Sequence, residues 1–214
     1  VIEELESFIE EQVKAAGIKC EGKKFISNLG ELSPDAVAED FVMAGFLEEK
    51  PEAERVEHQL PRPPIFCPGC PHRAVYYTLN HLNALVTTDI GCYTLGVLPP
   101  LNSGDTCIEM GASIGVAVGM AKARGNGKGI VATIGDSTFL HSGMTGLLNA
   151  VNDKADITVA ILDNSITAMT GGQFHPGTGK HLNGQPSQQV DFIKLCESLG
   201  IKRIKVVDSY DLAM

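Results

Sequence analysis

The spacing of hydrophobic residues divides the chain into two stretches with different periodicities. Within residues 1–58, apolar side chains recur at helical spacing through acidic sequence, at Ile2, Leu5, Ile9 and Val13. This spacing predicts a short amphipathic helix that ends at Gly17. Ser33 followed by Pro34 is typical of a second helix start, with serine as the N-cap and proline in the first turn.

A proline-rich segment follows these helices. Residues 60–64 read Leu-Pro-Arg-Pro-Pro, which predicts a stiff extended linker. We therefore place a domain boundary at about residue 60. Residues 1–60 form an acidic helical segment with its linker, and residues 61–214 form a second domain.

Beyond the boundary, short apolar runs alternate with helical patterns. The apolar runs predict buried strands at residues 84–88, 130–134, 157–162 and 203–207. The helical patterns predict helices at residues 71–83, 111–124, 135–151 and 190–199. Buried strands that alternate with helices indicate an α/β fold, a parallel sheet with helices on both faces, here preceded by a short helical segment. Ligands of such sheets bind at the carboxyl ends of the strands.

One predicted helix carries a stripe of small residues. Gly111, Gly115 and Gly119 lie four positions apart, on one side of the helix over residues 111–124. We expect this side to pack closely against a strand or another helix.

The composition is that of an ordinary globular chain, and the net charge is confined to one stretch of it. The 214 residues are 43% hydrophobic and 20% charged, as in ordinary globular chains, and they carry a formal charge of −9. All of that net charge lies in residues 1–58, which hold 15 acidic and 6 basic residues. Such an acidic balance predicts no nucleic-acid partner.

Membrane spanning and export are not expected. The longest stretch free of both charge and strong polarity, near residues 111–121, is far shorter than the roughly 20 residues of a membrane helix. The six cysteines are too few and too uneven for a secreted disulfide scaffold, and no signal peptide opens the chain. We therefore expect a cytoplasmic location, with thiols available for metal, cluster or redox chemistry.

Two acidic turns carry the candidate chemistry. Gly135-Asp136-Ser137 and Asp163-Asn164 each follow an apolar strand, and a single predicted crossover separates them, so the two strand ends should be neighbours. A carboxylate, an amide oxygen and the free N–H groups of a starting helix suit a divalent metal with a diphosphate. Either turn alone is more often a helix cap or a simple loop; the two together, at this spacing, indicate a site.

This pair of turns resembles the thiamine diphosphate motif, written G-D-G, about 25 residues, N-N. Further blocks resemble the 2-oxoacid:ferredoxin oxidoreductases, and within them the large subunit of the indolepyruvate enzymes: residues 67–73 (C-P-G-C-P-H-R), 89–96 (D-I-G-C-Y-T-L-G), 110–115 (M-G-A-S-I-G) and 163–173. This chain departs from the motif at Ser137, which replaces the second glycine, and at Asp163, which replaces the first asparagine. The metal-binding role at the second turn therefore rests on Asn164.

The resemblance implies a role for each matching position. Asp136 and Asn164 would bind Mg²⁺ through their side chains, and Ile166 through its backbone carbonyl. Residues that would line thiamine diphosphate are Gly69, Cys70, Ile90, Gly91, Cys92, Gly111, Ala112, Ser113, Gly135, Asp136, Ser137, Thr138, Asn164, Ile166, Thr167, Ala168 and Met169. The implied fold is the pyrophosphate-type domain of these enzymes.

Iron–sulfur and proton-transfer roles are less specific. The resemblance implies that Cys67, Cys70 and Cys92 bind a 4Fe-4S cluster, whose fourth ligand would lie outside the chain. A zinc site and a thioredoxin-like redox pair are less favoured interpretations of the same cysteines. His72 and His141 are candidate proton-transfer groups near the cofactor, with packing or capping roles as the open alternative.

The resemblance also implies an activity and partners. Such enzymes decarboxylate an arylpyruvate oxidatively, pass electrons to ferredoxin and release an acyl-coenzyme A. Expected partners are the pyrimidine-binding domain of the same subunit, which supplies the activating carboxylate, and a smaller beta subunit, in a hetero-oligomer. Two alternatives stay open: another 2-oxoacid such as pyruvate as substrate, or a fragment that only binds cofactor and is inactive alone.

Overall fold

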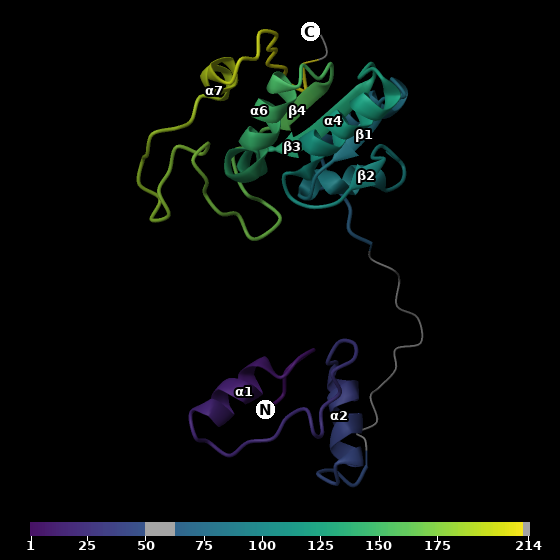
Figure 1. The fold of residues 1–214 in the computed structure, drawn as a ribbon, viewed down its shortest axis with the longest axis vertical. Coiled ribbons are helices and arrows are strands. Elements are labelled where there is room, and N and C mark those ends of the chain that lie inside the picture. The colour runs from purple at the N-terminus through teal and green to yellow at the C-terminus, as the bar shows by residue number, and fades with distance from the viewer. Residues whose placement is uncertain (50–62, 212–214) are drawn as a thin grey trace. The chain divides into compact units, whose positions relative to one another are not determined.

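The computed structural model describes residues 1–49 and 63–211 (Figure 1). Its contacts divide the chain into two compact units, Val1–Arg62 and Pro63–Met214. The predicted domain boundary near residue 60, and the predicted linker up to residue 62, lie outside the described residues. Each unit is therefore described by itself.

The first unit contains the two predicted helices. They are α1 (Phe8–Ala15) and α2 (Pro34–Met43). Ser33 caps α2 as predicted, since its Oγ accepts a hydrogen bond from Ala36 N at 3.1 Å. The prediction for the first helix began too early, because Ile2 and Leu5 precede α1 and Leu5 has a positive φ of 54°.

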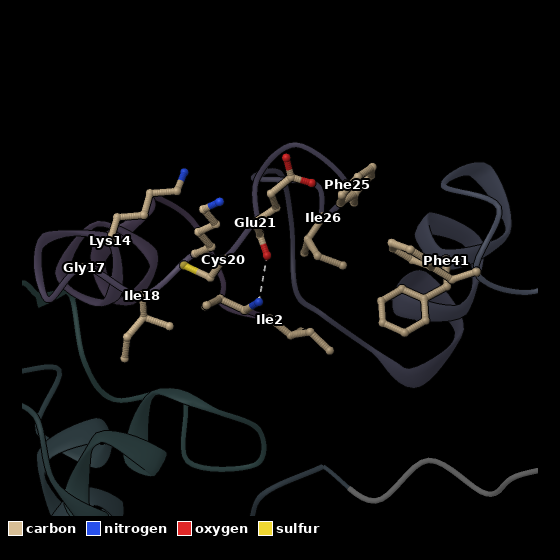
Figure 2. A pocket seen from close by; sticks show the side chains of 13 residues that line it. Ile2, Lys14, Gly17, Ile18, Cys20, Glu21, Phe25, Ile26 and Phe41 are labelled. Atoms are coloured by element: carbon tan, nitrogen blue, oxygen red, sulfur yellow. Dashed lines mark hydrogen bonds between the residues drawn. The ribbon is translucent and has the colours of Figure 1, made fainter.

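A pocket of about 760 Å³ opens in this first unit (Figure 2). Figure 2 shows Ile18, Ile26 and Phe41 among the side chains that line it. Phe41 and Phe25 both make edge-to-face ring contacts with Phe46. None of the predicted site residues lines this pocket, so it plays no part in the candidate site.

In the described part of the second unit, four parallel strands form one sheet in the order β2-β1-β3-β4. The strands are β1 (Leu85–Thr88), β2 (Thr106–Cys107), β3 (Ile130–Gly135) and β4 (Thr158–Leu162). Val86 pairs with Val131, and Ala132 pairs with Val159, all in parallel register. The predicted α/β fold with a parallel sheet is confirmed; the two-residue β2 had no signal in the sequence.

Helices cover both faces of this sheet. They are α3 (His72–His81), α4 (Ala112–Arg124), α6 (Met144–Asn152) and α7 (Phe192–Ser198), together with the short α5 (Asp136–Thr138), a π turn η2 (Phe139–Gly143) and a 3₁₀ turn η1 (Cys92–Val97). Figure 1 shows α4 and α6 against the strands. α5, η2 and α6 follow one another without a break, so the helix predicted from residue 135 to 151 is present with a π turn in it.

Side chains that alternate along the strands build a core on each face. Ile130, Ala132 and Ile134 pack with α4, α6 and α7 in one buried cluster. Val86 and Leu162 pack with α3 in the other. Two-sided burial explains why β3 reads as a continuous apolar run rather than an alternating one.

Two predictions for this unit are wrong. Residues 203–207 form no strand: Ile204 packs against a core cluster, but Val206 and Val207 are exposed. The glycine stripe of α4 is not a packing face either, because a Cβ built at Gly115 or Gly119 would meet nothing within 4 Å. α4 instead buries its opposite side.

Candidate functional site

The carboxyl ends of β3 and β4 lie side by side, as predicted. Gly135 pairs with Leu162, so Asp136 and Asp163, the next residue of each strand, emerge at the same edge of the sheet. Asp136 is 3% exposed, and its Oδ1 accepts a hydrogen bond from Ser137 N at 2.8 Å. Burial raises the pKa of the Asp136 carboxyl, the Ser137 N–H opposes this, and the neighbouring Asp163 carboxyl raises it further.

The turn after β4 is held by its own side chains. Asp163 Oδ1 accepts hydrogen bonds from Ser165 N at 2.8 Å and Ser165 Oγ at 3.1 Å. Asn164 Oδ1 accepts from Ile166 N at 3.3 Å. Ser165 has a positive φ of 55°, so the chain reverses sharply here and Asp163 acts as a turn residue.

The loop after this turn returns to the start of α5 at two points. Thr167 Oγ1 donates a hydrogen bond to Ser137 Oγ at 2.8 Å. His175 Nε2 lies 3.0 Å from Asp136 Oδ2, and both side chains are buried. His175 had no role in the sequence interpretation, because it lies in a glycine-rich loop 39 residues after its partner.

The end of β1 is organised by another buried carboxylate that the sequence interpretation passed over. Asp89 is fully buried, and its side chain accepts from Gly111 N at 2.8 Å and from Ser113 Oγ at 3.1 Å. Its Oδ1 also accepts from Ile90 N at 2.9 Å. One side chain thus ties together two of the predicted cofactor-lining segments, residues 90–92 and 111–113.

Tyr93 fills the space between two strand ends. A Cβ built at Gly91 or at Gly135 would lie 2.5 or 2.8 Å from Tyr93 Cε1, so only glycine fits at either position. The hydroxyl of Tyr93 donates to Ile90 O at 3.2 Å, and burial raises its pKa well above the ordinary value. The ring therefore remains neutral at physiological pH.

Comparison with known proteins identifies the family of the second unit. The family described as "Thiamine pyrophosphate enzyme, C-terminal TPP binding domain" matches residues 89–213, which include Asp89 and the turns that follow β3 and β4. The chain belongs to this family. Its thiamine pyrophosphate-binding domain therefore includes Asp89, Tyr93, Asp136 and His175.

Individual relatives are similar to this chain in sequence over most of its length. Indolepyruvate oxidoreductase subunit IorA of Pyrococcus abyssi is 39% identical over 99% of this chain, and that of Archaeoglobus fulgidus is 46% identical over 71%. The 2-oxoglutarate synthase subunit KorB of Archaeoglobus fulgidus is 25% identical over 69% of the chain. The chain spans 37% of the length of the Pyrococcus relative.

A solved structure supports the fold. A chain of the 2-oxoglutarate:ferredoxin oxidoreductase from Magnetococcus marinus superposes with a TM-score of 0.55 at 20% identity, over 65% of this chain and 52% of that one. The chain is thus similar in sequence to the indolepyruvate relatives and in fold to this oxidoreductase chain, and its fold is that of a thiamine pyrophosphate-binding domain.

The residues of this domain fit a metal-bound diphosphate. A single buried carboxylate and one amide oxygen, from Asp136 and Asn164, are the hard oxygen ligands that Mg²⁺ takes alongside phosphate oxygens. Gly111, with φ of 100°, is the N-cap of α4, and a Cβ there would lie 2.5 Å from Ser142 Cβ, so the backbone approaches the π turn η2 closely. In the described residues, no three His, Cys, Asp or Glu side chains are placed to hold a metal ion together, and this includes the predicted cluster cysteines Cys67, Cys70 and Cys92.

The three predicted cluster cysteines lie at the start of the domain, where Cys70 N donates a hydrogen bond to Cys67 O at 3.1 Å. Cys67 is exposed, whereas Cys70 and Cys92 are partly buried. Burial raises the pKa of the Cys92 thiol, and the nearby thiols of Cys70 and Cys67 raise it further. Their assignment as cluster ligands stays a prediction.

The two candidate histidines occupy different surroundings. His72 is buried, with Nδ1 3.5 Å from Cys70 Sγ, and its ring contacts Tyr93 edge-on at 6.0 Å between centroids. Burial lowers the pKa of His72, so the ring is neutral at pH 7. His141 is exposed on η2, where Nδ1 lies 2.6 Å from Ser142 Oγ. The proton-transfer roles of His72 and His141 stay predictions.

The remaining predicted residues divide by exposure. Ser113, Gly135 and Thr138 are buried and shape the strand ends. Ile90, Ala168 and Met169 are exposed, and so is Gly69, which has a positive φ of 68°. Among the described residues, none of the helices has the length and apolar character needed to cross a lipid bilayer.

Proposed function

We propose that this chain is the thiamine diphosphate- and Mg²⁺-binding part of an oxidoreductase that decarboxylates indolepyruvate and related arylpyruvates oxidatively. The products would be CO₂ and the acyl-coenzyme A, with two electrons passed one at a time to ferredoxin. The observation that carries the substrate assignment is the identity of 39% with an indolepyruvate oxidoreductase subunit over 99% of the chain.

Binding of the metal diphosphate is assigned to the ends of β3 and β4. Asp136 and Asn164 would bind Mg²⁺ through side-chain oxygens and Ile166 through its carbonyl. Ser137 and Thr138, at the start of the continuous helix α5–η2–α6, would donate to the diphosphate, where the helix dipole also favours an anion. The hydrogen bond from Thr167 to Ser137 supports this, because it holds the serine hydroxyl at the helix start.

The cofactor, when bound, supplies the electron sink that allows a 2-oxo acid to lose CO₂. This chain would contribute the residues that surround the bound cofactor. Gly91 and Gly135 allow Tyr93 to fill the gap between β1 and β3, which excludes water from the strand ends. Ile90 and Met169 are 37% and 53% exposed. Their apolar side chains would contact the thiazolium ring and an aryl substrate.

Cys67, Cys70 and Cys92 are assigned to a 4Fe-4S cluster. The thiols of Cys70 and Cys67 are close enough to Cys92 to raise the pKa of its thiol, and this supports the assignment. A cubane takes four thiolates, so the fourth would come from elsewhere in the complete protein. Such a cluster next to the cofactor would accept electrons one at a time.

The complete active site needs further protein. The carboxylate that activates the aminopyrimidine ring is assigned to a pyrimidine-binding domain of the same subunit, and a smaller beta subunit completes a hetero-oligomer in the cytoplasm. Residues 1–214 alone would bind cofactor without turnover.

Reduction of ferredoxin by the assembled oxidoreductase tests this assignment. Indolepyruvate, phenylpyruvate, pyruvate and 2-oxoglutarate are compared as substrates, each with and without coenzyme A. We expect kcat/KM to be highest for the arylpyruvates and turnover to vanish in Asp136→Ala. Asp153→Ala is the matched control, since Asp153 makes only a surface ion pair with Lys122. A preference for pyruvate or 2-oxoglutarate would overturn the substrate assignment.

A further inference from the structure

A buried histidine contacts the proposed metal ligand. The side chains of His175 and Asp136 are 5% and 4% exposed, and His175 Nε2 lies 3.0 Å from Asp136 Oδ2. The two residues are 39 positions apart, so only the folded loop brings them together. A buried polar pair of this kind is costly unless both members are fully hydrogen-bonded.

The second ring nitrogen of His175 fixes which atom carries the proton. Gly177 N donates a hydrogen bond to His175 Nδ1 at 3.1 Å, so Nδ1 is the acceptor. In the neutral ring the proton then resides on Nε2, which donates to Asp136 Oδ2. The imidazole therefore presents a donor, and not an acceptor, to the carboxylate.

Each oxygen of Asp136 keeps a free lone pair after these bonds. Oδ2 accepts from His175 and Oδ1 accepts from Ser137 N at 2.8 Å. A carboxylate oxygen has two acceptor positions, so one hydrogen bond on each oxygen leaves room for a metal. The two donors thus fix the plane of the carboxylate without occupying its metal-binding capacity.

The loop around His175 is built to hold the ring in place. Thr178 N and Thr178 Oγ1 each donate to His175 O at 2.8 Å, and Gln189 Nε2 donates to Gly177 O at 2.8 Å. A Cβ built at Gly177 would lie 2.8 Å from His175 Cε1, so glycine is required beside the ring. The loop thus holds the His175 ring through Nδ1 while Nε2 faces Asp136.

We propose that His175 is a positioning residue, which is held by the loop through Gly177 and orients Asp136 for Mg²⁺. This inference rests on the proposed function, because it takes Asp136 as the metal ligand. Partners that hydrogen-bond to metal ligands commonly change metal affinity by about 10- to 100-fold when they are removed. We expect an effect of this size for His175.

Three variants of the complete oxidoreductase test the inference. His175→Ala removes both hydrogen bonds of the ring. His175→Gln keeps an N–H donor at the position of Nε2 but has no acceptor at the position of Nδ1. His181→Ala is the matched control, since His181 lies in the same loop with its side chain exposed.

Two readouts are measured: the Mg²⁺ dependence of thiamine diphosphate binding by calorimetry, and hydrogen exchange at the Gly177 amide without ligands. We expect His175→Ala to weaken Mg²⁺ about 10- to 100-fold and His175→Gln to restore most of that loss. The Gly177 amide should exchange faster in both His175 variants, because its acceptor is gone, and unchanged in His181→Ala.

The outcomes separate this inference from the proposed function. No Mg²⁺-dependent binding by the unsubstituted protein would overturn the proposed function, and the inference with it. Normal binding by the unsubstituted protein and equal Mg²⁺ affinity in His175→Ala would overturn the inference alone. Equal loss in His175→Ala and His175→Gln would also overturn it, since the donor at Nε2 would then have no specific role.

Discussion

At the scale of single residues, buried polar side chains determine the geometry of the strand ends. Asp89 is fully buried and collects donors from Ile90, Gly111 and Ser113. Tyr76 is equally buried and joins Thr88 to Thr133 through its hydroxyl. These side chains have no chemistry of their own to perform; they hold in register the segments that do.

Asp89→Asn should destabilise the fold. The substituted amide places an N–H₂ group where the carboxylate accepts hydrogen bonds, so at least one buried donor loses its partner. We expect the free energy of unfolding to fall by about 2 to 3 kcal/mol, measured by urea denaturation. Asp153→Asn, at the surface, is the control; an equal effect of the two substitutions would contradict the role of Asp89.

Tyr76→Phe should lower stability at neutral pH by about 1 kcal/mol, because two threonine hydroxyls lose a partner. Burial raises the pKa of Tyr76 above its ordinary value of 10.0. A group whose pKa is raised by folding contributes fully below its unfolded pKa and loses that contribution as the pH rises. The difference between wild type and variant should therefore shrink above pH 10, by up to about 1.4 kcal/mol per pH unit. Urea unfolding between pH 7 and 11 measures it; a constant difference would contradict the role of the phenol.

The residues found from sequence and those missed differ in the range of their contacts. Asp136 and Asn164 were predictable because each directly follows an apolar strand, a purely local signal. Asp89 and His175 were not, since their partners lie 22 to 39 positions away. Nothing in the local sequence distinguishes His175 from His181, six residues later in the same loop.

At the scale of elements, helix α4 shows how glycines with the same spacing differ in function. Gly111 has a left-handed φ and contacts Ser142, whereas Gly115 meets nothing within 4 Å on the exposed side of the helix. The sequence predicted a common packing face because spacing alone does not show which side of a helix is buried.

Gly111→Ala and Gly115→Ala should change stability in opposite directions. At Gly111, the left-handed backbone and the clash with Ser142 predict a loss of about 2 to 4 kcal/mol. At Gly115, replacement inside an exposed helix predicts a gain of up to about 1 kcal/mol. Thermal unfolding of the two variants measures this, and a loss at Gly115 equal to that at Gly111 would show that the glycine stripe is a packing face after all.

The segment 203–207 shows a second limit of local patterns. Its apolar residues predict a strand, but a strand also needs a partner edge, and the described residues of this segment join no ladder. Ile204 is partly buried, by side-chain packing rather than by backbone pairing. A short apolar run is expected both for a segment buried by side-chain packing and for a paired strand, so the sequence alone could not distinguish the two.

At the scale of the whole molecule, the two hydrophobic cores come from the second unit alone. Every residue of both clusters lies between Phe66 and Ile204, and none belongs to α1 or α2. The net charge of −9 lies in residues 1–58, whereas residues 59–214 hold 11 acidic and 11 basic residues and carry no formal net charge.

A truncated protein of residues 63–214 should therefore fold. We expect its sheet amides to show the same hydrogen-exchange protection as in the longer chain, because all contacts of the two cores are retained. Loss of protection at Val86 and Ala132 after truncation would show that the first unit stabilises the sheet.

The central claim is that the ends of β3 and β4 bind thiamine diphosphate through Mg²⁺ at Asp136. Calorimetry of thiamine diphosphate binding to the complete oxidoreductase, with Mg²⁺ or with excess chelator, tests it most directly. We expect saturable binding that requires Mg²⁺ and is lost in Asp136→Ala but retained in Asp153→Ala. Binding of equal affinity in wild type and Asp136→Ala would contradict the account.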